Sequence, residues 1–307
     1  MEQDLWLTMS DQHDVFVHKW LADAIPPKAV LQLSHGMAEH ILRYDSFAQA
    51  LVVKGIFVYG HDHRGHGKTG EKNGLLGFFA DDNGFERVVE DVKEINEYIH
   101  KQYPDTPIYL LGHSMGSFIV RRFVQRFQGQ VDGVILSGTG GNPGLMGKIG
   151  KKLAKSQVRK LGNRTESQLM NKLTFGSYNK KIPKVETDFD WLTRDQQEIQ
   201  RYIDDPHCGY VSTAGFFYDL LFGLDIIHKD NEVKKIEKEL PFFFISGEQD
   251  PVGNYTKGVI GVIKQFRKCG MVDIDYTFYQ EGRHELLNEI NKQEVINDII
   301  HWLEAKI

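Results

Sequence analysis

The sequence predicts an α/β protein in which helices cover both faces of a mostly parallel sheet. Short apolar runs that are typical of buried strands alternate with longer helical patterns along most of the 307 residues. The alternation stops between residues 139 and 236, where helical patterns continue without a convincing strand. We therefore expect one core, residues 1–138 and 237–307, that carries a helical cap at 139–236.

The expected elements follow one another in a regular order. A long helix at 84–103 carries apolar residues at 85, 88, 89, 92, 95 and 99, the spacing of one buried helix face. A helix at 46–55 ends at Gly55, a residue typical of helix C-termini. Further helices are expected at 117–127, 256–270 and 292–307. Strands are expected at 14–20, 29–36, 56–62, 108–114, 131–138, 241–250 and 274–282.

Composition and charge exclude several classes of protein. The net charge of −5 gives no basic field, so we expect no nucleic-acid partner. The longest apolar runs, such as 241–245, are far shorter than the ~18 residues of a membrane-spanning helix. The N-terminus lacks the pattern of a secretory signal. Cys208 and Cys269 form neither a CxxC pair nor a disulfide framework, and we expect a cytoplasmic protein.

Residues 112–116, Gly-His-Ser-Met-Gly, have the G-x-S-x-G pattern of a nucleophile elbow. The pattern follows an expected strand and precedes an expected helix, which is where a serine can be held in a strained backbone conformation. The two glycines leave room for the tight turn. The helix that follows directs its N-terminus at the site and favours negative charge there. An ordinary glycine-rich turn is the alternative, and the context favours Ser114 as a nucleophile.

A nucleophilic serine needs a base and an acid that orients this base. In proteins with such an elbow, the Asp or Glu follows the serine and the His comes last. Asp250 ends the strand expected at 241–250, at the sheet edge where catalytic loops of parallel sheets lie. Glu248 is the rival acid. Asp273 and Asp275 flank a strand and are expected to face solvent.

His284 is the expected base, because it lies after the last expected strand and before the final helix. His301 also comes late, but it lies within an amphipathic helix. His228 lies in a charged stretch of the insertion, where we expect it to be solvated. We therefore predict catalytic roles for Ser114, Asp250 and His284.

Two backbone N–H groups are expected to form an oxyanion hole. Met115, the residue after the nucleophile, supplies one of them. The second is assigned to Met37, in the His-Gly turn that follows the strand expected at 29–36. Gly36 beside it allows the backbone to approach closely.

Five motifs make the chain resemble a known family. "HGMAEHILRY", "GHDHRGHGKTG", "GHSMGS", "SGEQDPVGNY" and "GRHELLNE" occur in the order found in α/β-hydrolases of the monoacylglycerol lipase and lysophospholipase group, often classed with the serine aminopeptidases. The resemblance implies an eight-stranded sheet with a mainly helical cap between the sixth and seventh strands. It also implies that Ser114, Asp250 and His284 form the catalytic triad.

The cap region contains two patterns whose roles stay open. Residues 148–164 carry seven Lys or Arg and no acid, with apolar residues at helical spacing. Such a helix either lies transiently on an anionic membrane or is a solvated lid helix. Residues 213–224 are aromatic and apolar, and they either line an acyl pocket or form the cap's own core. The pocket hypothesis assigns substrate contacts to Phe216, Phe217, Leu220 and Leu221.

The stretch "GHDHRGHGKTG" suggests a metal site on residue type alone. Metal binding would need His61, His63 and His66 to converge, which their spacing in a glycine-rich turn does not require. A phosphate loop would need the spacing G-x-x-x-x-G-K-[ST], which is missing. We instead expect a tight turn that is braced by the side chains of Asp62, Arg64 and His66.

The motifs and the resemblance together predict a serine hydrolase that cleaves a single-chain acyl ester, such as a monoacylglycerol or a lysophospholipid, through an acyl-enzyme intermediate. No metal or cofactor is expected. A carboxylesterase or a peptidase of the same fold is one alternative, although the cap offers no acidic cluster for a peptide amino terminus. A non-catalytic ligand-binding protein of this fold is the other.

Overall fold

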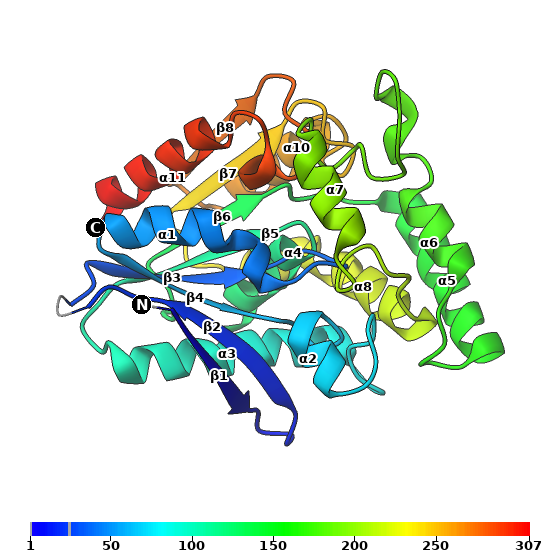
Figure 1. The fold of residues 1–307 in the computed structure, drawn as a ribbon, viewed down its shortest axis with the longest axis horizontal. Helices are drawn as coiled ribbons and strands as arrows, with labels where there is room; N and C mark the ends of the chain where they lie inside the picture. Colours follow the sequence, from blue (N-terminus) through cyan, green and yellow to red (C-terminus); the bar gives the residue numbers. More distant parts are fainter. Residues whose placement is uncertain (1, 24–25) are drawn as a thin grey trace.

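A sheet of eight strands runs through the centre of the protein (Figure 1). The structure is a computed structural model that describes residues 2–23 and 26–307. The strands found there are β1 (Glu2–Thr8), β2 (Asp14–Trp20), β3 (Ala29–Ser34), β4 (Ile56–His61), β5 (Ile108–His113), β6 (Gly133–Ser137), β7 (Phe242–Gly247) and β8 (Ile274–Tyr279). Their order across the sheet is β1-β2-β4-β3-β5-β6-β7-β8. β2 is antiparallel to β1 and β4 and all other pairs are parallel, which confirms the predicted mostly parallel sheet.

Seven of these strands coincide with strands predicted from the sequence, and β1 was not predicted. Its residues are mostly polar and exposed, so its own pattern is a weak signal for a strand. It forms because it pairs with β2 at the edge of the sheet, where Trp6 lies opposite Phe16 and the two rings are 5.5 Å apart.

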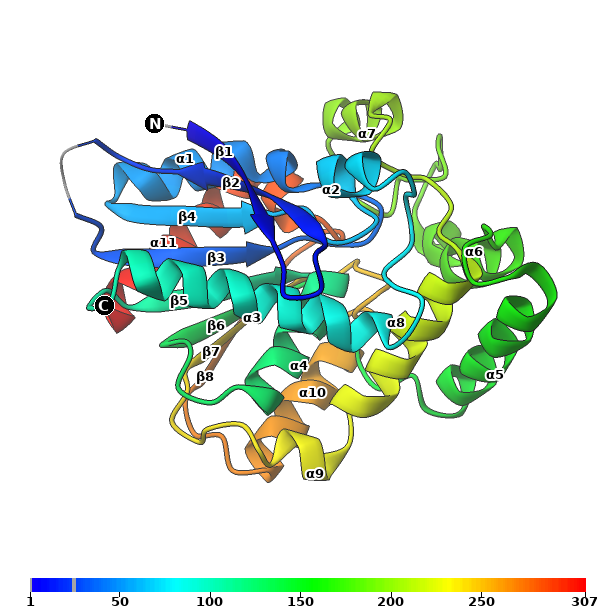
Figure 2. The ribbon, with the colours of Figure 1, turned by 90° about the horizontal axis from the view of Figure 1, so that it is seen from below.

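Helices cover both faces of the sheet, as predicted (Figure 2). Successive residues of a strand point to opposite faces, so Leu110 and Leu111 of β5 belong to two different buried clusters. Because both faces are covered, the central strands are almost wholly apolar in sequence. The helices on one face are α1 (Asp45–Val53) and α11 (Lys292–Lys306), and those on the other are α3 (Gly84–Gln102), α4 (Met115–Arg126) and α10 (Lys257–Lys268).

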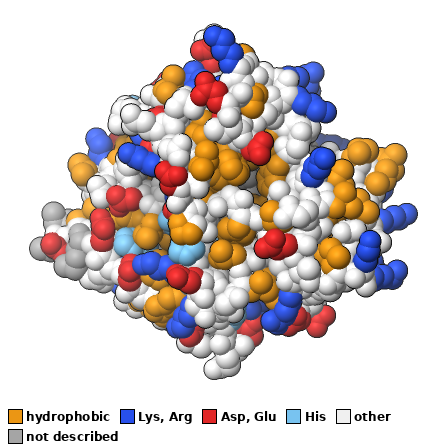
Figure 3. Space-filling view, turned by 45° about the vertical axis from the view of Figure 1, so that its right-hand side comes forward, with side chains coloured by type: hydrophobic (Ala, Val, Ile, Leu, Met, Phe, Trp, Pro, Cys, Tyr) orange, Lys and Arg blue, Asp and Glu red, His pale blue; other side chains and the backbone are white. Residues whose placement is uncertain are grey.

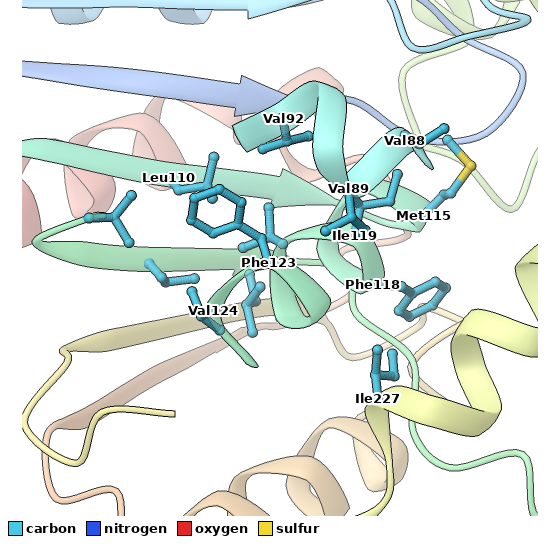
Figure 4. Packing of buried hydrophobic residues seen from close by; sticks show 14 of the residues in the cluster. Val88, Val89, Val92, Leu110, Met115, Phe118, Ile119, Phe123, Val124 and Ile227 are labelled. Carbon is cyan, nitrogen blue, oxygen red and sulfur yellow. The ribbon is translucent and has the colours of Figure 1, made fainter. Parts of the chain in front are cut away.

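The largest buried hydrophobic cluster of the described residues lies between the sheet and helices α3 and α4 (Figure 4). Val92 of α3, Leu110 of β5 and Phe123 of α4 are among the side chains that meet there. All six apolar positions that the sequence placed on one face of α3 are buried. The predicted buried face of this helix is therefore confirmed.

The chain between β6 and β7 forms helices. Helices α5 to α7 lie beyond the carboxyl edge of the sheet, where the parallel strands end (Figure 1). Helix α8 instead packs against α3 and α4, and a Cβ on its Gly223 would lie 2.4 Å from the ring of Phe85. The helices of this segment are α5 (Gly144–Leu161), α6 (Gln168–Phe175), η2 (Tyr178–Lys181), α7 (Gln196–Asp204), α8 (Ala214–Ile227) and α9 (Asp230–Val233).

The remaining helices among the described residues are short: η1 (Ile41–Tyr44), α2 (Gly67–Lys72) and η3 (Leu286–Asn288). Among the described residues, no helix has both the length and the apolar character needed to cross a membrane.

Polar side chains brace the turn that follows β4, as predicted. The two carboxylate oxygens of Asp62 accept the N–H groups of Ile41 and Lys68 at 2.8 and 2.7 Å. The Arg64 guanidinium pairs with the buried Asp91 carboxylate of α3 at 2.6 and 2.9 Å. These contacts tie the turn to the helices on either side of it.

The histidines of this turn bond to one another and to the backbone. Nε2 of His61 and Nδ1 of His63 are 3.0 Å apart, and Nε2 of His63 lies 3.0 Å from the Ser34 hydroxyl. Nδ1 of His66 donates to the Arg64 carbonyl at 2.9 Å. His61, His63 and Ser34 thus form a chain of hydrogen bonds inside the protein, and His66 bonds to the backbone beside it. Burial lowers the pKa of His61 to about 3 and that of His66 to about 4.

We expect acid to destabilise the fold in the range where unfolded histidines become protonated. Burial also lowers the pKa of His113 to about 3, so below about pH 6.5 the unfolded chain binds protons that the folded protein does not. Each such histidine lowers the free energy of unfolding by about 1.4 kcal/mol per pH unit as the pH falls toward its folded pKa. Asp219, whose pKa burial raises to about 7, and His284, whose pKa lies above its ordinary value, act in the opposite sense and are outnumbered by the buried histidines with lowered pKa values.

The measurement is chemical denaturation at several pH values between about 7 and 5. His66→Gln should flatten the dependence, because an amide can replace the hydrogen bond to Arg64 without titrating. His301→Gln is the matched control, since His301 is exposed on α11. A free energy of unfolding that rises on acidification would contradict this account.

Candidate active site

Ser114 lies in the turn between β5 and α4. Its φ of 50° and ψ of −118° place an L-residue in a strained backbone region. Both flanking positions must lack a side chain, because a Cβ on Gly112 would lie 2.6 Å from the Gly116 carbonyl oxygen, and one on Gly116 would lie 2.0 Å from that of Ser34. The N–H of Ser114 donates to Ser137 of β6 at 2.9 Å. This packing holds Ser114 in the wall of a cavity.

His284 and Asp250 form a buried pair beside this turn. Asp250 follows β7, His284 follows β8, and Nδ1 of His284 donates to Oδ2 of Asp250 at 3.0 Å. The other carboxylate oxygen accepts the N–H of Val252 at 2.8 Å. The Trp191 ring lies 5.0 Å from the His284 ring and shields it from the cap side. The pair is thus buried and firmly oriented.

The Asp250 carboxylate governs the charge of His284. Burial alone would lower the pKa of His284, but the adjacent negative charge and the hydrogen bond raise it, and the net pKa lies above its ordinary value. With Nδ1–H bonded to Asp250, the neutral ring presents an unprotonated Nε2. This arrangement suits a general base whose protonated form is stabilised.

The loop after β3 approaches Ser114 closely. A Cβ on Gly36 would lie 3.3 Å from the Cβ of Ser114 and 2.6 Å from Oε1 of Glu39. Met37 lies in the wall of the cavity that also contains Ser114. Met115 is the first residue of α4, so its N–H has no partner within the helix. Met115 thus adjoins Ser114 in the turn, Met37 lines the same cavity as Ser114, and their oxyanion-hole role stays a prediction.

Sequence reasoning missed a network of buried charges beside these residues. Arg43 pairs with Glu39 at 2.9 Å and with both oxygens of Glu285 at 2.6 and 2.7 Å. Burial raises the pKa of Glu39, whereas the Arg43 charge outweighs burial and holds the pKa of Glu285 below its ordinary value. Glu39 and Glu285 both line the cavity. The signal was present, because all three residues lie in the motifs "HGMAEHILRY" and "GRHELLNE".

The cavity lies between the cap and the carboxyl edge of the sheet, and its volume is about 580 Å³. Figure 3 shows the cap side of the molecule, where hydrophobic side chains gather around the middle of the face. The cap side of the wall includes Phe175, Val185, Phe189, Trp191, Leu192, Tyr202 and Tyr210.

Comparison with known proteins assigns the chain to a family. Residues 25–291 match the family described as serine aminopeptidase, S33. The chain belongs to this family. Monoglyceride lipase from Mus musculus is 27% identical over 99% of this chain and 92% of its own, and monoacylglycerol lipase from Mycolicibacterium smegmatis is 28% identical over 94% and 92%. A thermostable carboxyl esterase from Bacillus coagulans has a similar structure, with a TM-score of 0.92 at 26% identity over 99% of this chain and 98% of that one.

These similarities confirm the predicted α/β-hydrolase fold, and they relate this S33 family member to esterases and lipases over nearly its whole length. A lipase solved in an open form has the same fold, with a TM-score of 0.89 at 23% identity over 100% of this chain and 99% of that one.

The α8 side chains lie away from this cavity. Phe216, Phe217 and Leu220 are buried in the core that includes α3 and α4, and Leu221 packs against that core. Leu221 also faces α5, where a Cβ on Gly150 would lie 3.5 Å from it. Of the two hypotheses for residues 213–224, the contacts favour the packing role. The aromatic wall of the cavity comes instead from the segments around α6 and α7.

The rival acids and histidines do not line the cavity that contains Ser114. Glu248 is exposed, and Asp273 and Asp275 lie 2.6 and 3.9 Å from the Lys306 ammonium on α11. His301 is exposed on the same helix. The expectation that His228 is solvated was wrong. It is buried against the Arg121 guanidinium at 3.3 Å, because the chain after α8 folds back onto α4.

We expect Asp250→Asn to lower the pKa of His284 from above to below its ordinary value of about 6.5. An amide oxygen can still accept the Nδ1–H, but without the negative charge the effect of burial dominates. Histidine ring NMR as a function of pH measures the shift. Asp132→Asn, at the amino end of β6, is the matched control and should leave the titration unchanged. Equal titration in both variants would disprove the electrostatic role of Asp250.

Proposed function

We propose that this protein is a serine ester hydrolase that cleaves single-chain acyl esters of the monoacylglycerol or lysophospholipid type. The proposal is carried by one observation: Ser114 and His284 share the wall of one cavity, and Asp250 lies behind His284. The relatives named monoglyceride lipase support this class of substrate.

In this mechanism the Ser114 hydroxyl attacks the ester carbonyl carbon while Nε2 of His284 takes its proton. Asp250 orients the ring through Nδ1–H and stabilises the imidazolium. The N–H groups of Met37 and Met115 bind the negative oxygen of the tetrahedral intermediate. His284 then protonates the leaving alcohol, and water, activated by the same histidine, releases the acid from Ser114. These steps need no metal or cofactor.

The cavity suits a substrate with one apolar chain and one polar end. Its volume lies within the range of about 300–1,000 Å³ typical of small-molecule sites. Phe175, Phe189 and Trp191 give its cap side an apolar surface for an acyl chain. Glu39 and Glu285 offer carboxylate oxygens to hydroxyl groups of the leaving alcohol.

The same carboxylates favour a second candidate, a peptidase or amidase that binds a cationic amino terminus. The sequence showed no acidic cluster in the cap, and these two residues come from the core. Because Arg43 pairs with both of them, its charge already balances one of the two carboxylates. Comparing aminoacyl anilides with nitrophenyl esters as substrates separates the two activities.

A non-catalytic protein of this fold would fail to react with a fluorophosphonate probe at Ser114.

We further propose that the cap contacts lipid surfaces transiently. Leu145, Met146 and Ile149 at the start of α5 are 72%, 74% and 51% exposed, and the basic stretch 148–164 begins among them. Exposed apolar side chains beside lysines suit an anionic lipid surface. Figure 3 shows hydrophobic and basic side chains together on this side of the molecule.

Ser114→Ala should abolish hydrolysis across a panel of monoacylglycerols, lysophospholipids and diacyl lipids, because no other group replaces the attacking hydroxyl. We expect a loss of at least about a thousandfold in kcat. The wild type should cleave the single-chain lipids in preference to diacyl lipids. Activity that survives in this variant, with an unchanged circular dichroism spectrum, would rule out Ser114 as the nucleophile.

The double substitution Leu145→Ser with Met146→Ser should weaken co-sedimentation with anionic vesicles, because it removes apolar surface that would enter the lipid interface. Hydrolysis of a short, water-soluble ester should not change. Val53→Ser is the matched control, since Val53 is 84% exposed on α1, on a face of the sheet away from the cap. Equal loss of sedimentation in both variants would contradict a specific role of α5.

A further inference from the structure

A group of side chains that can bind a metal ion lies where the cap meets the loop after β3. Nε2 of His40, a carboxylate oxygen of Asp205 and Sγ of Cys208 all lie within 4.8 Å of one another. His40 and Asp205 are already in contact, at 2.8 Å. The side chains of His40 and Asp205 are 12% and 29% exposed and Cys208 is buried, so an ion could enter from solvent and be largely enclosed.

The donors have the chemistry that Zn²⁺ prefers. Imidazole nitrogen, carboxylate oxygen and thiolate sulfur are its usual protein ligands, and in a tetrahedral site they lie about 3.5 Å apart. The three donors lie within 4.8 Å of one another, so the site closes if the side chains move by about 1 Å toward a common ion. The His207 ring, 5.9 Å from that of His40, offers a further nitrogen as a fourth ligand. Coordination would release the thiol proton of Cys208 to solvent.

The surrounding charges also favour a cation. Asp205 contributes a carboxylate to the group itself, and Glu71 lies 3.5 Å from Nε2 of His207. Arg43 is the cation that faces Cys208, and its charge is taken up by Glu39 and Glu285, as described above. A divalent ion would therefore not meet an uncompensated positive charge.

We propose that His40, Asp205 and Cys208 bind a divalent transition-metal ion of the Zn²⁺ type, which fastens the cap segment after α7 to the loop that contains Met37. Two hydrogen bonds already join α7 and the segment after it to this loop at the Ala38 carbonyl, which accepts from Oη of Tyr202 in α7 at 2.8 Å and from the Gly209 N–H at 3.0 Å. The ion adds a stronger link at the same place. It restrains a boundary of the cavity and takes no part in bond cleavage.

This site is separate from the histidine-rich turn at 60–70 and does not depend on the proposed hydrolase activity. Sequence inspection did not find it, because 165 residues separate His40 from Asp205. No short motif spans such a distance, and only the docking of the cap onto the core brings the donors together.

Binding of Co²⁺ to the full chain, freed of metal with a chelator, tests the proposal. We expect one Co²⁺ per chain, a thiolate-to-metal absorption band, and displacement of the Co²⁺ by Zn²⁺. The chain has two cysteines, so the band can be assigned by substitution. Cys208→Ser should abolish it, whereas Cys269→Ser, which alters the cysteine beside Asp230, should leave it unchanged. Absence of the band in the wild type, or its loss only in Cys269→Ser, would overturn the proposal.

Two further measurements keep the test independent of folding defects. Asp205→Asn retains the thiol and the shape of the side chain, and it should weaken Co²⁺ binding by at least about tenfold. Hydrogen exchange at the Gly209 N–H should slow when Zn²⁺ is added to the wild type and should not respond in Cys208→Ser. Unchanged Co²⁺ affinity in Asp205→Asn would contradict the proposed site. An unchanged hydrogen-exchange rate at Gly209 in the wild type after Zn²⁺ is added would contradict the fastening role.

Discussion

The close packing that holds Ser114 in its strained turn is the constraint on which the rest of the site depends. Strain of this kind costs on the order of 1–3 kcal/mol and persists only where the surroundings leave the backbone no alternative. Here Gly116 lies against the Ser34 carbonyl of β3, and the N–H of Ser114 is bonded to β6. Three adjacent strands therefore determine where the serine lies. The loops after β7 and β8 bring Asp250 and His284 to the same edge, because parallel strands end together.

Charge organises the region between the core and the cap. Arg43 joins Glu39, next to the loop with Met37, to Glu285, next to His284. One buried cation thus connects the two loops on either side of the cavity. Its guanidinium also stacks on the Tyr202 ring of α7, 4.8 Å away. Removing it would leave two buried carboxylates without a positive charge beside them, and such groups are costly to bury.

The histidines show how environment decides the role of one residue type. In the turn after β4 burial dominates, so His61 and His66 stay neutral and serve as hydrogen-bonding core residues. His284 is as deeply buried, but the Asp250 carboxylate reverses the shift and stabilises the protonated ring. His40 is partly exposed beside a carboxylate and a thiol, a setting that suits a metal ligand. Residue type alone drew attention to the histidines of the turn after β4. The neighbouring side chains are what make His284 and His40 candidates for function.

The sequence by itself determined the layered α/β fold, the serine turn and the candidate order Ser114, Asp250, His284, because these depend on periodicity, turn chemistry and chain order. Only the tertiary structure decided which side chains meet. β1 forms only because its weak strand sequence pairs with β2. Phe216 is buried in the core, and the Trp191 ring lies beside His284. The tertiary structure also brought His40 to Cys208. Periodicity shows which face of an element is buried but not what covers that face, since the covering residues come from distant parts of the chain.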